Sequence, residues 1–241
     1  MDGFADIVVS AGPGGGPEVR VFDANTLNVL TQFYAYAPSF SGGVTVATGE
    51  TDGSGFPSLI TGAGPGGGSH VEIWRNALMY AIGSTPILPG AQTISTFTLI
   101  FQFMAYESAY TGGVNVSTGL VGGMSQGGFD RIITGTMNGA PLVSVWQAME
   151  NMDPFPVSAT PQIEYTMQSS FFAFNSNDTN GVFVGAVDGS TGSDLIVTQG
   201  KGSNVLSRYS FLPGTTNPTL EDEFSPFPIG FLGGISLGGT N

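Results

Sequence analysis

Few residues of this chain have the chemistry of a catalytic or metal-binding group. The chain has no Cys, which excludes thiolate metal sites and cysteine nucleophiles, and its single His, His70, argues against multi-His metal sites. Gly62-Ala63-Gly64-Pro65-Gly66-Gly67 has the letters of a dinucleotide-binding loop. That use requires a helix directly after the loop, whereas residues 69–74 alternate as a strand does. We therefore predict a glycine turn between strands, a surface strand position for His70, and no enzymatic activity.

Charge and composition exclude further classes of function. The 18 acidic and 5 basic residues give a formal net charge of −13, which repels a polyphosphate, so we expect no nucleic-acid partner. No stretch of 18 apolar residues occurs, so we expect no membrane span. Only 10% of the residues are charged, against about 25% in typical domains, and a surface of Ser, Thr, Asn, Gln and Gly suits an extracellular or particle-surface protein. No signal peptide is visible before the first apolar run.

Two sequence motifs recur along the chain and define its organisation. The first, Gln32–Tyr36 followed by Phe40–Gly43, returns at 102–113, 170–181 and 223–234. The second, Asp6–Gly16, returns as Ser58–Gly68, with weaker copies at 130–135 and 194–198. The spacing indicates a unit of about 52 residues, lengthened by insertions at 76–95 and 147–162, which we expect to be specialised surface.

Each unit has the pattern of four short strands. In the first unit these are residues 7–9, 18–22, 27–36 and 43–47, bounded by Gly, Pro, Asn or Asp. Repetition of four antiparallel strands is typical of a β-propeller blade. We therefore predict an all-β fold, a β-propeller of four-stranded antiparallel blades, in one domain over residues 1–241. Its approximate repeats are 4–55, 56–128, 129–192 and 193–241.

The two ends of the chain have complementary patterns. The chain begins at the second strand of a unit and ends with a first strand, so we predict that residues 233–241 join residues 1–10, with Gly234–Gly238 beside Ile7–Ser10. Closure within one chain gives a ring of four blades, and closure between chains gives a larger ring or a filament. A piece of a longer repeat array has the same pattern.

The amino-acid sequence of the repeats resembles that of a known family. Residues 6–23, DIVVSAGPGGGPEVRVFD, are similar to the FG-GAP repeats of integrin α-type propellers, especially a bacterial-type subgroup. The resemblance is strong over residues 6–74 and weak after them. It implies a secreted or cell-surface propeller that is used for adhesion or ligand binding.

The same resemblance implies calcium loops, which are eroded here. Calcium requires six to eight oxygen ligands. The positions that correspond to the family's ligands are Glu50, Asp52, Ser54 and Ser58 in the first loop, Asp188, Ser190 and Asp194 in the third, and Asn241, Asp2 and Asp6 across the chain ends. The second loop keeps only Asp130. We expect weak calcium binding at most, or simple tight turns.

Three functions follow from these expectations. The first is a non-catalytic extracellular binding or adhesion module with a protein or glycan partner. The second is a structural subunit of a surface layer, filament or particle, assembled from further copies of the chain. The third is a carbohydrate-binding lectin that uses Trp74, Trp146 or Tyr residues between blades. Trp74 and Trp146 occupy equivalent strand positions, which favours a place in the core between blades, and Glu221–Glu223 is expected to be a solvated outer strand.

Overall fold

The structure, a computed structural model, consists of strands and their connections. It describes residues 6–76, 96–122, 129–151, 162–189, 192–211 and 215–237. Within these ranges every regular element is a strand, which confirms the predicted all-β class. No helix in the described part of the chain is long and apolar enough to cross a membrane.

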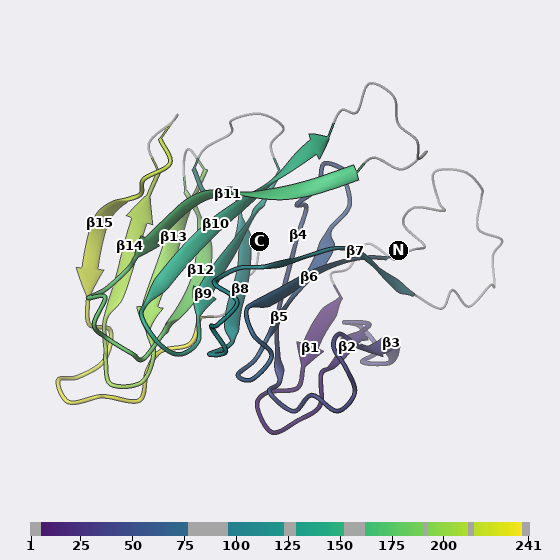
Figure 1. The fold of residues 1–241 in the computed structure, drawn as a ribbon, viewed down its shortest axis with the longest axis horizontal. Helices are drawn as coiled ribbons and strands as arrows, with labels where there is room; N and C mark the ends of the chain where they lie inside the picture. Colours follow the sequence, from purple (N-terminus) through teal and green to yellow (C-terminus); the bar gives the residue numbers. More distant parts are fainter. Residues whose placement is uncertain are drawn as a thin grey trace.

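The strands form four antiparallel sheets, each with its strands in sequence order. The first sheet has three strands, β1 (Ile7–Ser10), β2 (Glu18–Phe22) and β3 (Val29–Tyr34). The second has four, β4 (Val44–Gly49), β5 (Ser58–Ala63), β6 (His70–Asn76) and β7 (Phe97–Met104). The third comprises β8 (Val114–Gly119), β9 (Arg131–Thr136), β10 (Leu142–Asn151) and β11 (Gln162–Phe172). The fourth comprises β12 (Val182–Gly189), β13 (Gly192–Gln199), β14 (Leu206–Ser210) and β15 (Thr219–Phe224). The sheets follow one another across the molecule (Figure 1).

Sheets and sequence repeats are offset by one strand. Each of the first three repeats contributes three strands to one sheet and the first strand of the next, as β4 shows by pairing with β5 rather than with β1. Among the first strands, β8 is a neighbour of both β4 and β12 across the sheet boundaries. Consecutive sheets are therefore linked through the chain itself as well as through packing.

Two local expectations need correction. The third strand begins at Val29 rather than Leu27, because Leu27 has a left-handed backbone with φ of 57° in a turn closed by Asp23. The Asp23 carboxylate accepts hydrogen bonds from the amides of Asn25 and Thr26 in that turn. The insertion predicted at 147–162 begins as a strand extension, since β10 and β11 stay paired as far as Asn151 and Gln162. Residues 77–95 and 152–161 of the two insertions lie outside the described residues.

One backbone hydrogen bond recurs at the three boundaries between sheets and again between the fourth sheet and the segment 231–237. It runs from a glycine amide, in the turn after the strands β1, β5, β9 and β13, to a carbonyl that precedes β4, β8, β12 or residue 235. Its length is 2.9 Å in all four cases, which are Gly14 to Ser41, Gly66 to Thr111, Gly139 to Thr179 and Gly202 to Leu232. The motif Gly62–Gly67 therefore belongs to a turn between strands, as predicted, and its amides form hydrogen bonds within the fold.

A second glycine makes this close approach possible. It lies directly before β4, β8, β12 and residue 235, and its φ is positive in each case: 79° at Gly43, 87° at Gly113, 66° at Gly181 and 77° at Gly234. A Cβ atom on Gly43 would lie less than 3.0 Å from backbone atoms of Gly12 and Pro13. Both the backbone conformation and the lack of a side chain are thus required here.

Side-chain hydrogen bonds cross the same boundaries. The carbonyl of the first residue of each first strand accepts a bond from a polar side chain of the preceding sheet, and the position 235 carbonyl does the same. The bonds are Ser10 to Val44, 2.7 Å, Thr45 to Val114, 2.7 Å, Asn115 to Val182, 2.6 Å, and Thr198 to Ile235, 2.5 Å. Polar side chains of β1, β4, β8 and β13 find hydrogen-bond partners in this way.

Aromatic pairs also pack across each of the three boundaries between sheets. The recurring Phe of one sheet packs against the aromatic residue of the next, with ring centroids 4.7 Å apart for Phe33–Trp74, 4.5 Å for Phe103–Trp146 and 5.0 Å for Phe171–Tyr209. The indole N–H groups of Trp74 and Trp146 donate to Thr61 and Thr134, at 3.1 and 3.0 Å. These contacts confirm that both tryptophans belong to the core between sheets.

The chain ends do not form a ladder within the described residues. There, β1 pairs with β2 alone, and residues 234–237 are not part of a strand. Residues 235–237 instead lie against the fourth sheet, where Thr198 donates to Ile235 and Leu237 lies beside Gly185. They thus follow the course of a first strand, while the predicted pairing of 233–241 with 1–10 also involves residues 1–5 and 238–241, which lie outside the described residues.

The glycine contact at the boundary predicts a specific mutational pattern. Gly14→Ala introduces a Cβ at a φ of 92° with no atom within 4 Å, so we expect only the conformational cost of about 1–2 kcal/mol. Gly43→Ala adds an overlap with backbone, which we expect to cost about 1–3 kcal/mol more. Urea unfolding of both variants measures the difference. Equal destabilisation of the two variants would contradict the close approach.

Candidate functional site

Side chains that could take part in binding or catalysis lie in three places. The first is the loop between β4 and β5, which carries predicted calcium ligands. The second is a carboxylate on β6, Glu72, beside His70. The third is a pocket between the third and fourth sheets.

In the β4–β5 loop, the predicted ligand Asp52 interacts with protein groups. Its side chain is fully buried, and its oxygens accept hydrogen bonds from the Ser54 amide at 3.0 Å and the Ser58 hydroxyl at 3.3 Å. The guanidinium of Arg75 on β6 forms an ion pair with the same carboxylate. Burial acts to raise the pKa of Asp52, but the bonds from Ser54 and Arg75 outweigh it, and the pKa lies below its ordinary value.

The other predicted carboxylate ligand of this loop, Glu50, lies at the boundary between the second and third sheets. Its amide donates to the Asp130 carboxylate at 3.0 Å, and its carbonyl accepts from the Asp130 amide at 2.7 Å. Burial and the nearby charge of Asp52 raise the pKa of Glu50. Because Arg75 supplies the positive charge at this loop, a calcium ion there would have to displace a guanidinium, and the donors described around Asp52 do not fit a calcium shell.

The remaining predicted ligands are dispersed. Asp194 pairs with Arg208 at 2.9 Å, and Arg208 also pairs with Asp222 of the exposed strand β15. The backbone of Asp188 faces Ser193 in the β12–β13 hairpin, and Asp6 lies exposed before β1. Asp2, Ser190 and Asn241 lie outside the described residues. Within the described ranges, no three His, Cys, Asp or Glu residues come together as a metal site.

Strand β6 carries a buried carboxylate that sequence analysis did not single out. The Glu72 side chain is only 7% exposed, and its Oε1 lies 3.8 Å from Nε2 of His70. Its Oε2 atom is buried and has no hydrogen-bond partner among the described residues. Burial raises the pKa of Glu72 to about 7. His70 lies at the start of β6, as predicted, with Nε2 2.8 Å from Oε1 of Gln102.

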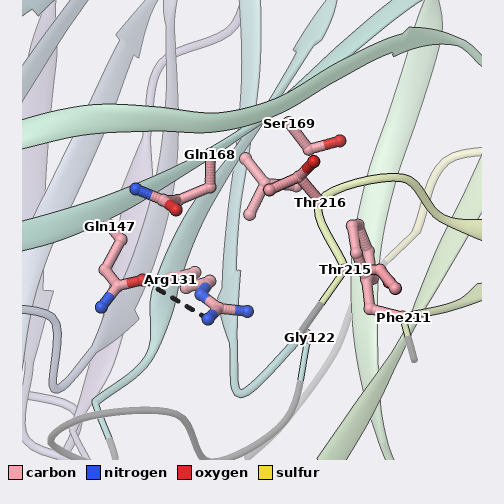
Figure 2. A pocket seen from close by; sticks show the side chains of 9 residues that line it. Gly122, Arg131, Gln147, Gln168, Ser169, Phe211, Thr215 and Thr216 are labelled. Carbon is pink, nitrogen blue, oxygen red and sulfur yellow. Dashed lines mark hydrogen bonds between the residues drawn. The ribbon is translucent and has the colours of Figure 1, made fainter. Parts of the chain in front are cut away.

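The pocket between the third and fourth sheets has a volume of about 200 Å³. Strands β9, β10 and β11 contribute polar side chains on one side, and the connection between β14 and β15 closes the other (Figure 2). The lining residues are Gly122, Arg131, Val145, Gln147, Gln168, Ser169, Phe211, Thr215 and Thr216. An arginine, two amides and three hydroxyls therefore surround a space between two consecutive sheets.

Arg131 contributes a positively charged guanidinium to the lining of this pocket. Its guanidinium donates to the carbonyl of Val121 and, at 3.4 Å, to Oε1 of Gln147, as the dashed line in Figure 2 marks. Gly122 lies beside the guanidinium, and its φ of 86° is a backbone conformation that residues with a side chain rarely adopt. Burial lowers the pKa of Arg131, but an arginine keeps its charge near neutral pH.

No sequence motif marked the residues of the pocket. They come from three strands and two connections of different repeats, so their approach depends on how two sheets pack. One signal was available, since Arg131 directly follows Asp130 and precedes the buried Ile132 and Ile133. A cation beside an apolar strand is unusual in a chain with 5 basic residues.

Comparison of the chain with protein-family models gives no match, and comparison with curated proteins gives none either.

The ion pair in the β4–β5 loop predicts a large loss of stability. Arg75→Met leaves the buried Asp52 carboxylate without its cation, which we expect to cost about 3–5 kcal/mol in urea unfolding. The double variant Asp52→Asn with Arg75→Met removes both charges and should recover part of that loss. Arg20→Met is the control, because the Arg20–Glu18 pair is exposed and contributes about 0–1 kcal/mol. A loss for Arg75→Met no larger than for Arg20→Met would refute the role of the pair.

Glu72 predicts a pH dependence of stability. Its pKa rises from 4.5 in the unfolded chain to about 7 in the folded chain, so the folded state holds the proton more tightly. The stability from this proton is present below pH 4.5 and is lost as the pH rises to about 7, by about 3 kcal/mol.

Urea unfolding at pH 5 and pH 7.5 measures this difference. Glu72→Gln should remove most of it, because the amide does not titrate. Glu164→Gln, at an exposed position of β11, should leave it in place. The explanation fails if the two variants show the same difference between the two pH values.

Proposed function

We propose that this protein is a non-catalytic binding module built from propeller-like blades, which works outside the cell or on a cell or particle surface. The repetition of the boundary supports the propeller arrangement. When equivalent contacts join consecutive sheets, each sheet is related to the next by a similar rotation. Such a rotation arranges the blades of a propeller around an axis. The neighbouring first strands β4, β8 and β12 correspond to the inner strands of such blades.

The resemblance to FG-GAP repeats agrees with this proposal. The glycines of the recurring sequence motif, among them Gly14 and Gly66, make the backbone hydrogen bonds between consecutive sheets. Membership in that family would therefore explain why the motif is repeated. The low content of charged residues, 10%, supports the proposed location.

The pocket between the third and fourth sheets is the observation that carries the binding function. Its polar groups are an arginine, amides and hydroxyls, which hold a ligand through hydrogen bonds and are not proton-transfer groups near neutral pH. Trp74 and Trp146, expected as stacking platforms in a lectin, pack between sheets instead. A ligand is thus expected at the pocket rather than on the tryptophans.

Binding to arrays of glycans and of extracellular proteins tests the proposal. The wild-type protein should bind members of at least one array and release them chemically unchanged. Thr216→Trp, at the exposed rim of the pocket, should fill the space and abolish this binding. Thr219→Trp, at an exposed position of β15, is the matched control and should bind as the wild type does.

Two results would overturn the binding function. One is undiminished array binding by Thr216→Trp, which would place the partner elsewhere. The other is a covalent change in the bound compound, detected by mass spectrometry, which would make the protein an enzyme.

A further inference from the structure

The first and fourth sheets each carry one half of the contact that joins consecutive sheets. We propose that the fourth sheet of one copy of this protein packs on the first sheet of a second copy, and that residues 235–237 of the one pair with residues 9–11 of the other. The inference concerns assembly, so it goes beyond the binding function proposed above and does not depend on the pocket.

A backbone hydrogen bond links the first strand of each four-stranded sheet to the end of the next strand. The three bonds run from Gly64 to Gly43 at 2.9 Å, from Met137 to Gly113 at 2.9 Å, and from Gly200 to Gly181 at 3.1 Å. In the first sheet the corresponding donor is the amide of Gly12, which has the place of Gly64 in the recurring motif. The corresponding acceptor is the carbonyl of Gly234, which follows the fourth sheet as Gly43 follows the first. The fourth bond of this series is thus divided between the two ends of the described chain.

The segment that can complete the first sheet is already held in the position of a first strand. Leu232 accepts the boundary hydrogen bond from Gly202 at 2.9 Å, and the carbonyl of Ile235 accepts one from Thr198 at 2.5 Å. Residues 235–237 nevertheless belong to no strand, and β1 pairs with β2 alone within the described residues. Two unpaired strand edges therefore remain, and such edges readily pair with another chain.

The pairing of β4 with β5 gives the register of the proposed contact. There the strand pairs are Val44 with Ala63, Thr45 with Gly62 and Val46 with Thr61. The same register places residues 235, 236 and 237 opposite Ala11, Ser10 and Val9, and it joins the amide of Gly12 to the carbonyl of Gly234.

The first sheet exposes an apolar position whose counterparts are buried. Ile7 on β1 lies opposite Phe22, as the equivalent residues of β5, β9 and β13 lie opposite an aromatic residue of the next strand. Those residues, Leu59, Ile132 and Leu195, are at most 1% exposed and pack in the clusters shared with the preceding sheet, whereas Ile7 is 43% exposed. This side of β1 lacks the neighbouring sheet that covers its counterparts in the described chain.

The fourth sheet exposes the matching residue at the other end. The recurring Phe of each of the first three sheets packs against an aromatic residue of the next sheet. Its counterpart in the fourth sheet, Phe224, is 54% exposed. Phe22 occupies on β2 the place that Trp74 occupies on β6. Association of the two sheets therefore brings Phe224 to Phe22 and covers Ile7, as at the boundaries within the chain.

The arrangement of the sheets assigns the missing half to a second copy. Figure 1 shows the first and fourth sheets at opposite ends of the row of sheets, and the glycine contacts fix each boundary between them. Two copies satisfy both ends at once when they close a ring of eight sheets, which lies within the range of about 4–8 blades known for propellers. Each copy then gives residues 235–237 to its partner and receives the same residues from it, with twofold symmetry.

Sedimentation equilibrium of the full chain tests this assembly. At a salt concentration of about 0.15 M, which screens the formal charge of −13 on each copy, we expect twice the mass of one chain. Ile7→Lys places a charge in the contact and should weaken the association at least about thirtyfold. Met149→Lys, at an exposed apolar position of the third sheet, is the control and should associate as the wild type does. Lysine lowers the negative charge of both variants, so long-range repulsion does not explain a loss, and thermal unfolding confirms that each is folded.

A disulfide maps the contact, because the chain has no Cys of its own. Counted from the hydrogen-bonded pair Gly12–Gly234, positions 9 and 237 form a pair without hydrogen bonds, with Cα atoms about 4.5 Å apart, which suits a disulfide. Mixing the single variants Val9→Cys and Leu237→Cys should therefore cross-link two copies under oxidising conditions, as peptide mass spectrometry detects. A mixture of Met149→Cys with Leu237→Cys is the control and should give no such link.

The inference fails on any of three results. The first is the mass of a single chain at every concentration up to the limit of solubility. The second is undiminished association of Ile7→Lys. The third is a disulfide within one chain in the double variant Val9→Cys with Leu237→Cys, which would show that the ring closes without a partner. Masses that grow beyond two copies with concentration would support the contact as that of an open filament and reject the closed ring.

Discussion

The approach of two backbones at a glycine is the constraint on which the rest of the structure depends. At each boundary a glycine with positive φ, such as Gly43, lets one loop lie against the backbone of another, and a 2.9 Å hydrogen bond joins them. Because hydrogen-bond geometry is narrow, this contact sets the distance between consecutive sheets. The aromatic pairs farther out, such as Phe103–Trp146, then pack at nearly the same separation at each boundary.

The same boundaries bring charged and polar groups into the interior, and most of them are used by the fold. Asp52 is paired with Arg75, and Glu50 is bound to Asp130 of the next sheet. A loop that resembles a calcium site thus joins two sheets through hydrogen bonds between protein groups. The pocket between the third and fourth sheets differs, because Arg131 there lines an open space together with amide and hydroxyl side chains.

Local pattern was sufficient to predict much of the architecture. Alternation in Glu18–Phe22 and the glycine turns around Gly64 indicated strands, and both were found. The equivalence of Trp74 and Trp146 correctly indicated a core position for each. The start of β3 was wrong, because the turn at Asp23 gives Leu27 a left-handed backbone that residue pattern alone does not show.

The sequence by itself determined the class of fold and the repetition, since strand periodicity and turn glycines are local properties of neighbouring residues. Only the tertiary structure decided which side chains meet. Arg75 reaches the β4–β5 loop residue Asp52 from β6, and Arg131 and Gln168 line one pocket through the pairing of three strands. Distances between residues so far apart in the chain depend on how sheets pack, and a single sequence carries no direct record of that packing.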